Sequence, residues 1–131
     1  VKYMKVVVDT SILIDYLRGG TKWETFIADA DKDIELFLPT IVIFELFSGT
    51  STKNHHKKED VVDFIKQFSK IDLDEQIARK AGELFRDLKR TFQVPDYIIA
   101  ATALSTNATV LTLNRKHFEQ IPGLSIYEST N

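Results

Sequence analysis

The sequence contains no cysteine, no long apolar run and no strong excess of charge of either sign. The lack of cysteine excludes disulfides, thiolate metal sites and cysteine nucleophiles. No segment is apolar for long enough to span a bilayer, and the short run near residue 4 lacks the features of a signal peptide. We therefore expect a cytoplasmic protein with no membrane segment. The net charge of −2 means that any contact with nucleic acid needs a local basic region.

The composition is that of an ordinary globular protein. The chain has 131 residues, of which 44% are hydrophobic and 27% charged, and this length suffices for one domain with a substantial core. No repeat or linker interrupts it, so we expect residues 1–131 to form a single domain. Short apolar runs predict strands at residues 4–8, 34–38, 70–73, 109–112 and 124–127.

The segments between these runs have helical spacing and helix-starting residues. Thr10 or Ser11 is predicted to cap the first helix, and Asp74 a later one. Residues 41–44 have the composition of a strand, but the preceding Pro39-Thr40 favours a helix start. Strands that alternate with helices predict an α/β fold with three layers, in which a central parallel sheet lies between helices.

Three acids stand in or beside apolar segments, where a lone carboxylate is costly to bury. Asp9 ends the first predicted strand, Glu45 lies within a predicted helix, and Asp96 lies in the first turn of another. Each has an ordinary interpretation taken alone: Asp9 as a helix cap, Glu45 as a partly exposed helix residue, Asp96 as compensation for the helix dipole.

The acids acquire a different meaning if they lie together. Ligands of open α/β folds bind at the carboxyl edge of the sheet, where Asp9 is expected. Neighbouring carboxylates repel one another unless a cation is bound, and carboxylate oxygens are the preferred ligands of Mg²⁺ and Mn²⁺. Such a metal lowers the pKa of a water and offsets charge on a phosphate. The acids therefore predict a divalent metal site.

Four segments resemble a known family in their order and spacing. They are Val-Asp-Thr-Ser-Ile-Leu-Ile at 8–14, Pro-Thr-Ile-Val-Ile-Phe-Glu-Leu-Phe-Ser-Gly at 39–49, Asp-Tyr-Ile-Ile-Ala-Ala-Thr-Ala-Leu at 96–104 and Leu-Thr-Leu-Asn-Arg-Lys-His-Phe at 111–118. Together they resemble the PIN-domain family, and more narrowly the VapC toxins of type II toxin–antitoxin pairs. The resemblance covers nearly the whole chain and implies the same three-layer fold.

The resemblance also implies an activity. It implies an endoribonuclease that depends on Mg²⁺ or Mn²⁺, leaves 5′-phosphate and 3′-hydroxyl ends, pairs as a homodimer and is silenced by an antitoxin. Asp9, Glu45 and Asp96 match the family's catalytic acids, with Asp9 and Asp96 as metal ligands. Thr10, Ser11 and Thr112 are candidates for hydroxyls that orient the acids or waters.

The last segment departs from the family pattern, which often has a further acid there. Asn114 is a common variant whose amide can still bind a metal or water. His117 stands where the family often has aspartate, and it is either a surface residue or a substitute ligand. The substitution leaves a second metal open.

Two other functions remain open. One is a non-catalytic PIN-like module that binds RNA or protein, motivated by Asn114 and His117. The other is an enzyme that forms an aspartyl phosphate on Asp9. Ser11 argues against the second, because haloacid dehalogenase-like enzymes have an acid two residues after the nucleophile.

A basic segment follows the predicted Glu45 helix. It has two interpretations, a solvated helix start or an edge that contacts phosphates. Its members are Lys53, His55, His56, Lys57 and Lys58.

Overall fold

The computed structural model describes residues 3–30, 33–88 and 91–128. Within these residues, five parallel strands form one sheet in the order β3-β2-β1-β4-β5. The strands are β1 (Met4–Val8), β2 (Ile34–Pro39), β3 (Ser69–Ile71), β4 (Thr109–Leu111) and β5 (Ser125–Ile126).

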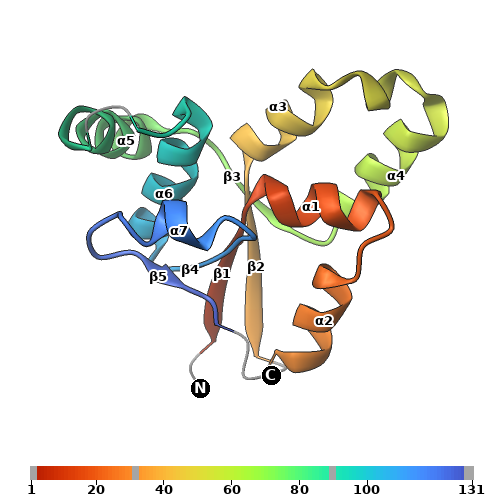
Figure 1. The fold of residues 1–131 in the computed structure, drawn as a ribbon, viewed down its shortest axis with the longest axis horizontal. Coiled ribbons are helices and arrows are strands. Elements are labelled where there is room, and N and C mark those ends of the chain that lie inside the picture. The colour runs from red at the N-terminus through yellow and green to blue at the C-terminus, as the bar shows by residue number, and fades with distance from the viewer. Residues whose placement is uncertain (1–2, 31–32, 89–90, 129–131) are drawn as a thin grey trace.

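Helices cover both faces of this sheet. They are α1 (Thr10–Leu17), α2 (Lys22–Asp29), α3 (Thr40–Ser48), α4 (His55–Ile65), α5 (Glu75–Asp87), α6 (Val94–Thr106) and α7 (Arg115–Phe118), with a 3-10 turn η1 (Thr50–Lys53). Figure 1 shows α5 and α6 on one side of β1 and β2, and α1, α2 and α4 on the other. The predicted α/β fold, a parallel sheet between helices, is confirmed.

The centre of the sheet is β1, which is buried on both faces. Val6, Val7 and Val8 are fully buried, as expected for a strand inside a parallel sheet covered on both sides. β2 and then β3 lie on one side of β1 in the sheet, and β4 and then β5 lie on the other side. The strand order therefore reverses between β1 and β4, which makes this the switch point of the sheet. Open α/β folds bind ligands at the carboxyl ends of the two strands at such a point.

Most helix starts agree with the sequence-based expectation. The helix at Thr40 is confirmed over the alternative strand. Asp74 caps α5, since its carboxylate accepts a hydrogen bond from the Ile77 amide at 2.8 Å. The prediction that Thr10 or Ser11 caps α1 is wrong. Asp9 is the residue before α1, and the two hydroxyls lie inside the first turn.

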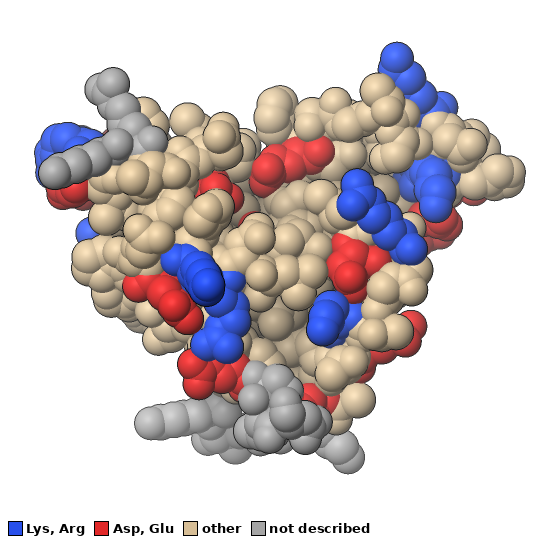
Figure 2. Space-filling model, in the orientation of Figure 1, with Lys and Arg blue, Asp and Glu red and all other residues tan. Residues whose placement is uncertain are grey.

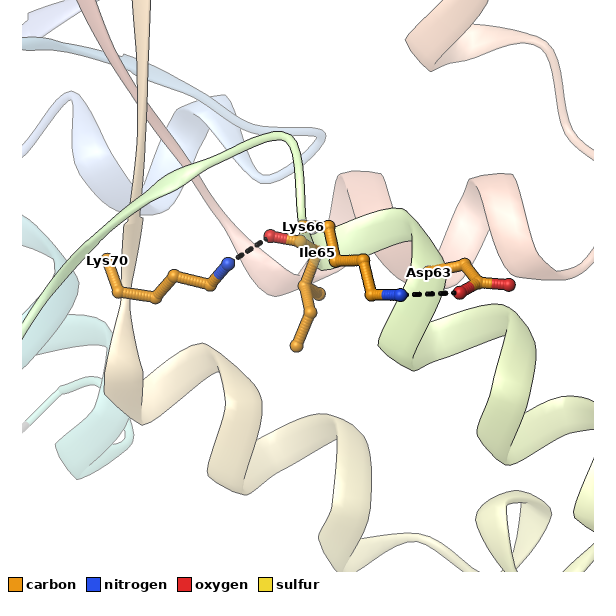
Figure 3. Close-up of polar contacts among 4 residues, drawn as sticks. All are labelled: Asp63, Ile65, Lys66 and Lys70. Carbon is orange, nitrogen blue, oxygen red and sulfur yellow. Dashed lines mark hydrogen bonds and ion pairs between the residues drawn. The ribbon is translucent and has the colours of Figure 1, made fainter.

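A lysine of β3 binds the C-terminal end of α4. Lys70 Nζ donates to the Ile65 carbonyl at 2.5 Å, and Lys66 forms an exposed ion pair with Asp63 at 3.2 Å (Figure 3). A cation at a helix C-terminus also favours the helix dipole. Both lysines are thus engaged with α4 itself. Over the described parts of the chain, no helix is long and apolar enough to cross a membrane.

Candidate active site

Asp9 lies at the carboxyl end of β1 and is only 3% exposed. Its backbone amide donates to the Leu111 carbonyl of β4 at 2.9 Å, which joins the two strands at the switch point. The Ser11 and Thr112 hydroxyls both donate to Asp9 Oδ2, each at 2.7 Å. A buried carboxylate is therefore held by two neutral donors, with α1 supplying one and the end of β4 the other.

The two hydroxyls are themselves fixed by the loop after β4. The Leu113 amide donates to Ser11 Oγ at 3.0 Å, and the Asn114 amide donates to Thr112 Oγ1 at 2.9 Å. These bonds orient the hydroxyls toward Asp9. Ser11 and Thr112 thus have the contacts expected of residues that position an acid.

Glu45 reaches the same region from the middle of α3. Thr10 Oγ1, in the first turn of α1, donates to Glu45 Oε1 at 2.6 Å. Burial raises the pKa of Glu45 above its ordinary value, the Thr10 hydrogen bond opposes this rise, and repulsion from Asp9 and Asp96 adds to it. Glu45 is therefore within electrostatic reach of both other acids.

Asp96 lies in the first turn of α6, where it also caps the helix. Its Oδ2 accepts a hydrogen bond from the Gln93 amide at 3.3 Å, as half of a capping box. Burial and then the Asp9 charge raise the pKa of Asp96, while the Gln93 amide and the positive charge of His117 lower it. The ordinary interpretation of Asp96 is thus correct but incomplete, because the residue also faces the Asp9 charge.

No cation neutralises the three acids within the described ranges, where every ion pair involves other residues. In the same ranges, no three histidine or acidic side chains lie close enough together to hold a metal as a group. The three acids thus influence one another's pKa values. That they bind one metal together stays a prediction. Mg²⁺ keeps several waters and often binds only one or two carboxylates, so Asp9 and Asp96 still suit a hydrated ion.

The surface around these acids is hollowed. Figure 2 shows acidic side chains over α3 and over the start of α6, on opposite sides of a central depression. Lysine and arginine side chains gather over α7 on one flank and over α1 and α4 on the other. Acidic side chains also lie beside these bases on both flanks, and Arg115 of α7 pairs with Glu119 and Glu128, so the positive charge there is partly neutralised.

The two departures from the family pattern both lie at the surface. Asn114 and His117 are exposed. The His117 ring packs against the Phe92 ring, with centroids 5.0 Å apart, and the side chain lies within electrostatic reach of Asp96. Gln93, which binds Asp96, was not foreseen from the sequence, because a capping box usually has Ser or Thr three residues before Glu or Gln, and the pair of Gln93 and Asp96 departs from that pattern.

Comparison with known proteins gives consistent results. The chain matches the family model of the PIN domain over residues 6–124. It is 33% identical over 130 residues to Ribonuclease VapC1 of Methanocaldococcus jannaschii, covering 95% of this chain and 88% of that protein. It is also 32% identical over 116 residues to Ribonuclease VapC10 of Mycobacterium tuberculosis, covering 86% and 85%.

Solved structures show the same likeness. The crystal structure of VapBC2 from Rickettsia felis, bound to a DNA fragment from its promoter, matches with a TM-score of 0.84 and 25% identity over 95% of this chain and 98% of that one. A toxin–antitoxin complex from Klebsiella pneumoniae matches with a TM-score of 0.75 and 27% identity over 94% and 98%.

Proposed function

Because this chain belongs to the PIN-domain family, and within it to the VapC group, we propose that it is an endoribonuclease toxin that hydrolyses RNA phosphodiester bonds. The observation that carries the proposal is the buried Asp9 carboxylate at the switch point, with Glu45 and Asp96 in electrostatic reach and no ion pair to any of the three acids among the described residues. The relatives named as ribonucleases span most of the chain and support the same activity.

The uncompensated charge at these acids supports a need for a divalent cation. Asp9 and Asp96 would hold Mg²⁺ or Mn²⁺, since carboxylate oxygens suit both ions. When bound, such an ion supplies Lewis acidity and positive charge toward a phosphate. Retention of a second ion is a separate question, because Asn114 and His117 supply no carboxylate.

The protein's own residues prepare the site for this chemistry. Ser11 and Thr112 bind Asp9 Oδ2 and so fix the orientation of its carboxylate. Thr10 binds one oxygen of Glu45, and the raised pKa of that carboxyl suits a group that takes a proton from an attacking water. We therefore assign Asp9 and Asp96 to metal binding and all three acids to catalysis.

The proposal includes two protein contacts, with an antitoxin and with a second copy of the chain. The solved neighbours include toxin–antitoxin complexes, which supports the first. Large apolar side chains at the surface support a protein contact in general: Phe44 is 63% exposed and Val94 57%. RNA and antitoxin together would place the protein in the cytoplasm.

The test is cleavage of single-stranded RNA by the purified chain, with Mg²⁺, with Mn²⁺ and with EDTA. We expect cleavage only with a metal, products that carry 5′-phosphate and 3′-hydroxyl ends, and no cleavage by Asp9→Asn. No cleavage by the wild-type chain with either metal, or cleavage by Asp9→Asn at the wild-type rate, would refute the proposal.

The same preparation separates the two alternatives. A non-catalytic module would bind RNA with no cleavage under any metal condition. An aspartyl-phosphate enzyme would retain phosphate covalently on Asp9 after incubation with a phosphorylated substrate, which mass spectrometry detects.

A further inference from the structure

A cavity lies between α1, α3 and α4, and one of the three proposed catalytic acids lines it. Glu45 lines it, so this residue faces both the Thr10 hydroxyl and the cavity. The volume is about 360 Å³. Pockets that bind compounds of small-molecule size measure roughly 300–1,000 Å³, so the space suits one nucleotide but not a folded domain.

One wall of the cavity is apolar. Ile14 and Leu17 of α1 line it together with Leu46 of α3 and Val61 of α4. Ile14 remains 36% exposed although it stands next to the buried pair Ile12 and Leu13. Nucleobases present flat faces that bind apolar and aromatic side chains with little sequence preference, and this wall offers such a surface.

The rim of the cavity carries two positive charges. Arg18, just after α1, and Lys57, in the first turn of α4, both line it. Neither forms an ion pair with an acid in the described ranges, whereas Lys66 and Arg115 do. Lys57 Nζ donates to the Leu17 carbonyl at 3.5 Å, which holds the ammonium at the rim and leaves its other protons free to bind.

A neighbouring hollow shows where the positive rim ends. Arg18 and Lys57 also line this second hollow, but its other charged residues are Glu24, Asp60 and Asp63. These acids repel a further phosphate. The two cations therefore suit a single phosphate at the border between the hollows.

Resting on the ribonuclease function proposed above, we propose that the cavity binds the nucleotide next to the scissile phosphodiester bond. The base packs against the apolar wall, and Arg18 and Lys57 bind its distal phosphate. Glu45, which also lines the cavity, lies toward the bond that is cut. The apolar wall accepts the face of any base, so the limited size of the cavity decides which nucleotides fit beside the cleavage position. Of the basic segment that follows α3, it is Lys57 that contacts the strand.

Affinity for RNA without metal tests the cations. The probe is a short fluorescent single-stranded RNA of mixed sequence, in EDTA, followed by anisotropy. The double variant Arg18→Gln/Lys57→Gln should weaken binding about tenfold, the ratio that follows from losing one charge-assisted hydrogen bond. The control Lys53→Gln/Lys58→Gln makes the same change in net charge on exposed residues of the same segment, and should weaken binding by less than about threefold because it removes only long-range attraction.

Filling the cavity tests the base site. Gly49 lines the cavity with φ −77° and ψ 164°, which any residue can adopt, and an added Cβ there meets no atom within 4 Å. Gly49→Leu should therefore fold normally, occupy the cavity and change which phosphodiester bonds are cut in a mixed RNA. Thr50→Leu adds bulk at the exposed neighbouring position and should leave the cleavage pattern unchanged.

Equal RNA affinity for the two double variants, together with an unchanged cleavage pattern in Gly49→Leu, overturns the proposal. If those variants instead lose an antitoxin while RNA affinity is kept, the cavity binds protein and the proposal is wrong. Failure of the ribonuclease function itself looks different, because the wild-type chain then cleaves no RNA with either metal.

Discussion

At Asp9 the ordinary interpretation of the residue fails for a specific reason. The residue precedes α1, yet its carboxylate caps no amide of that helix. Both hydrogen bonds that it accepts in the described structure come from hydroxyls, which leave its charge in place. Asp9 is thus held for its charge and its orientation rather than for the start of the helix.

We predict that Asp9→Asn abolishes cleavage and leaves the fold intact. An asparagine can still accept the two hydroxyl bonds through its carbonyl oxygen, and the substitution removes repulsion on Glu45 and Asp96. The free energy of unfolding without metal should change by less than about 1 kcal/mol or increase. Chemical denaturation measures this, with the exposed Asp72→Asn as control. A clear loss of stability would show that the carboxylate serves mainly as a structural acceptor.

His117 stands where the family often has aspartate, and we predict that it lies outside the metal site. It is exposed and packs on Phe92, so His117→Ala should leave Mg²⁺ affinity and cleavage within about twofold of wild type. His117→Asp should likewise leave Mg²⁺ affinity within about twofold of wild type, because a carboxylate outside the site does not reach the metal. Calorimetric Mg²⁺ titration measures both, and His56→Ala is the matched control. A large loss of affinity in His117→Ala would make the histidine a ligand.

At the scale of elements, the site depends on how the ends of β1 and β4 are joined to α1. Thr112 follows β4 and binds Asp9 Oδ2 while it accepts the Asn114 amide. It is buried, so its hydroxyl has little access to water. One side chain thus connects the Asp9 carboxylate to the loop that leads into α7.

We predict that Thr112→Val destabilises the protein by about 1–3 kcal/mol, because it removes a donor from a buried carboxylate and an acceptor from an amide. Cleavage should fall as well, since the Asp9 carboxylate loses one of the two hydroxyl hydrogen bonds that orient it. Thr112→Ser should restore most of both properties. Thr109→Val, at the start of β4, should change stability by less than about 0.5 kcal/mol. Urea unfolding provides the comparison, and equal effects at the two positions would contradict the assigned role.

At the scale of the whole molecule, the clustered acids make stability depend on pH and metal. The pKa values of Glu45 and Asp96 are raised above ordinary values of 4.5 and 3.8. The folded state therefore holds these protons more strongly than the unfolded state does. The resulting stabilisation is fully present below the ordinary pKa values and is lost as pH rises through the raised ones.

We predict that the metal-free protein loses thermal stability between mildly acidic and neutral pH, and that Glu45→Gln with Asp96→Asn reduces this loss. Mg²⁺ should stabilise the wild type most at neutral pH, where the acids are ionised, and should have little effect on the double variant. Scanning calorimetry at several pH values measures the trend. The same pH dependence in wild type and double variant would show that these acids are not its source.

The sequence by itself determined the alternation of strands and helices, because each short apolar run and each helix start is a local signal. It also placed Asp9 at a strand end and Asp96 in a first turn, both of which the structure confirms. The wrong cap at α1 shows the limit of local signals. Thr10 and Ser11 are good caps by type, but a glutamate 35 residues away and an adjacent buried aspartate use their hydroxyls instead.

Only the tertiary structure decided the order of the strands and hence which side chains meet. Thr112 reaches Asp9 because β4 pairs with β1, and Arg18 shares a cavity with Glu45 and Lys57 because α1, α3 and α4 pack together. Such contacts join residues far apart in the chain, and no local pattern encodes them.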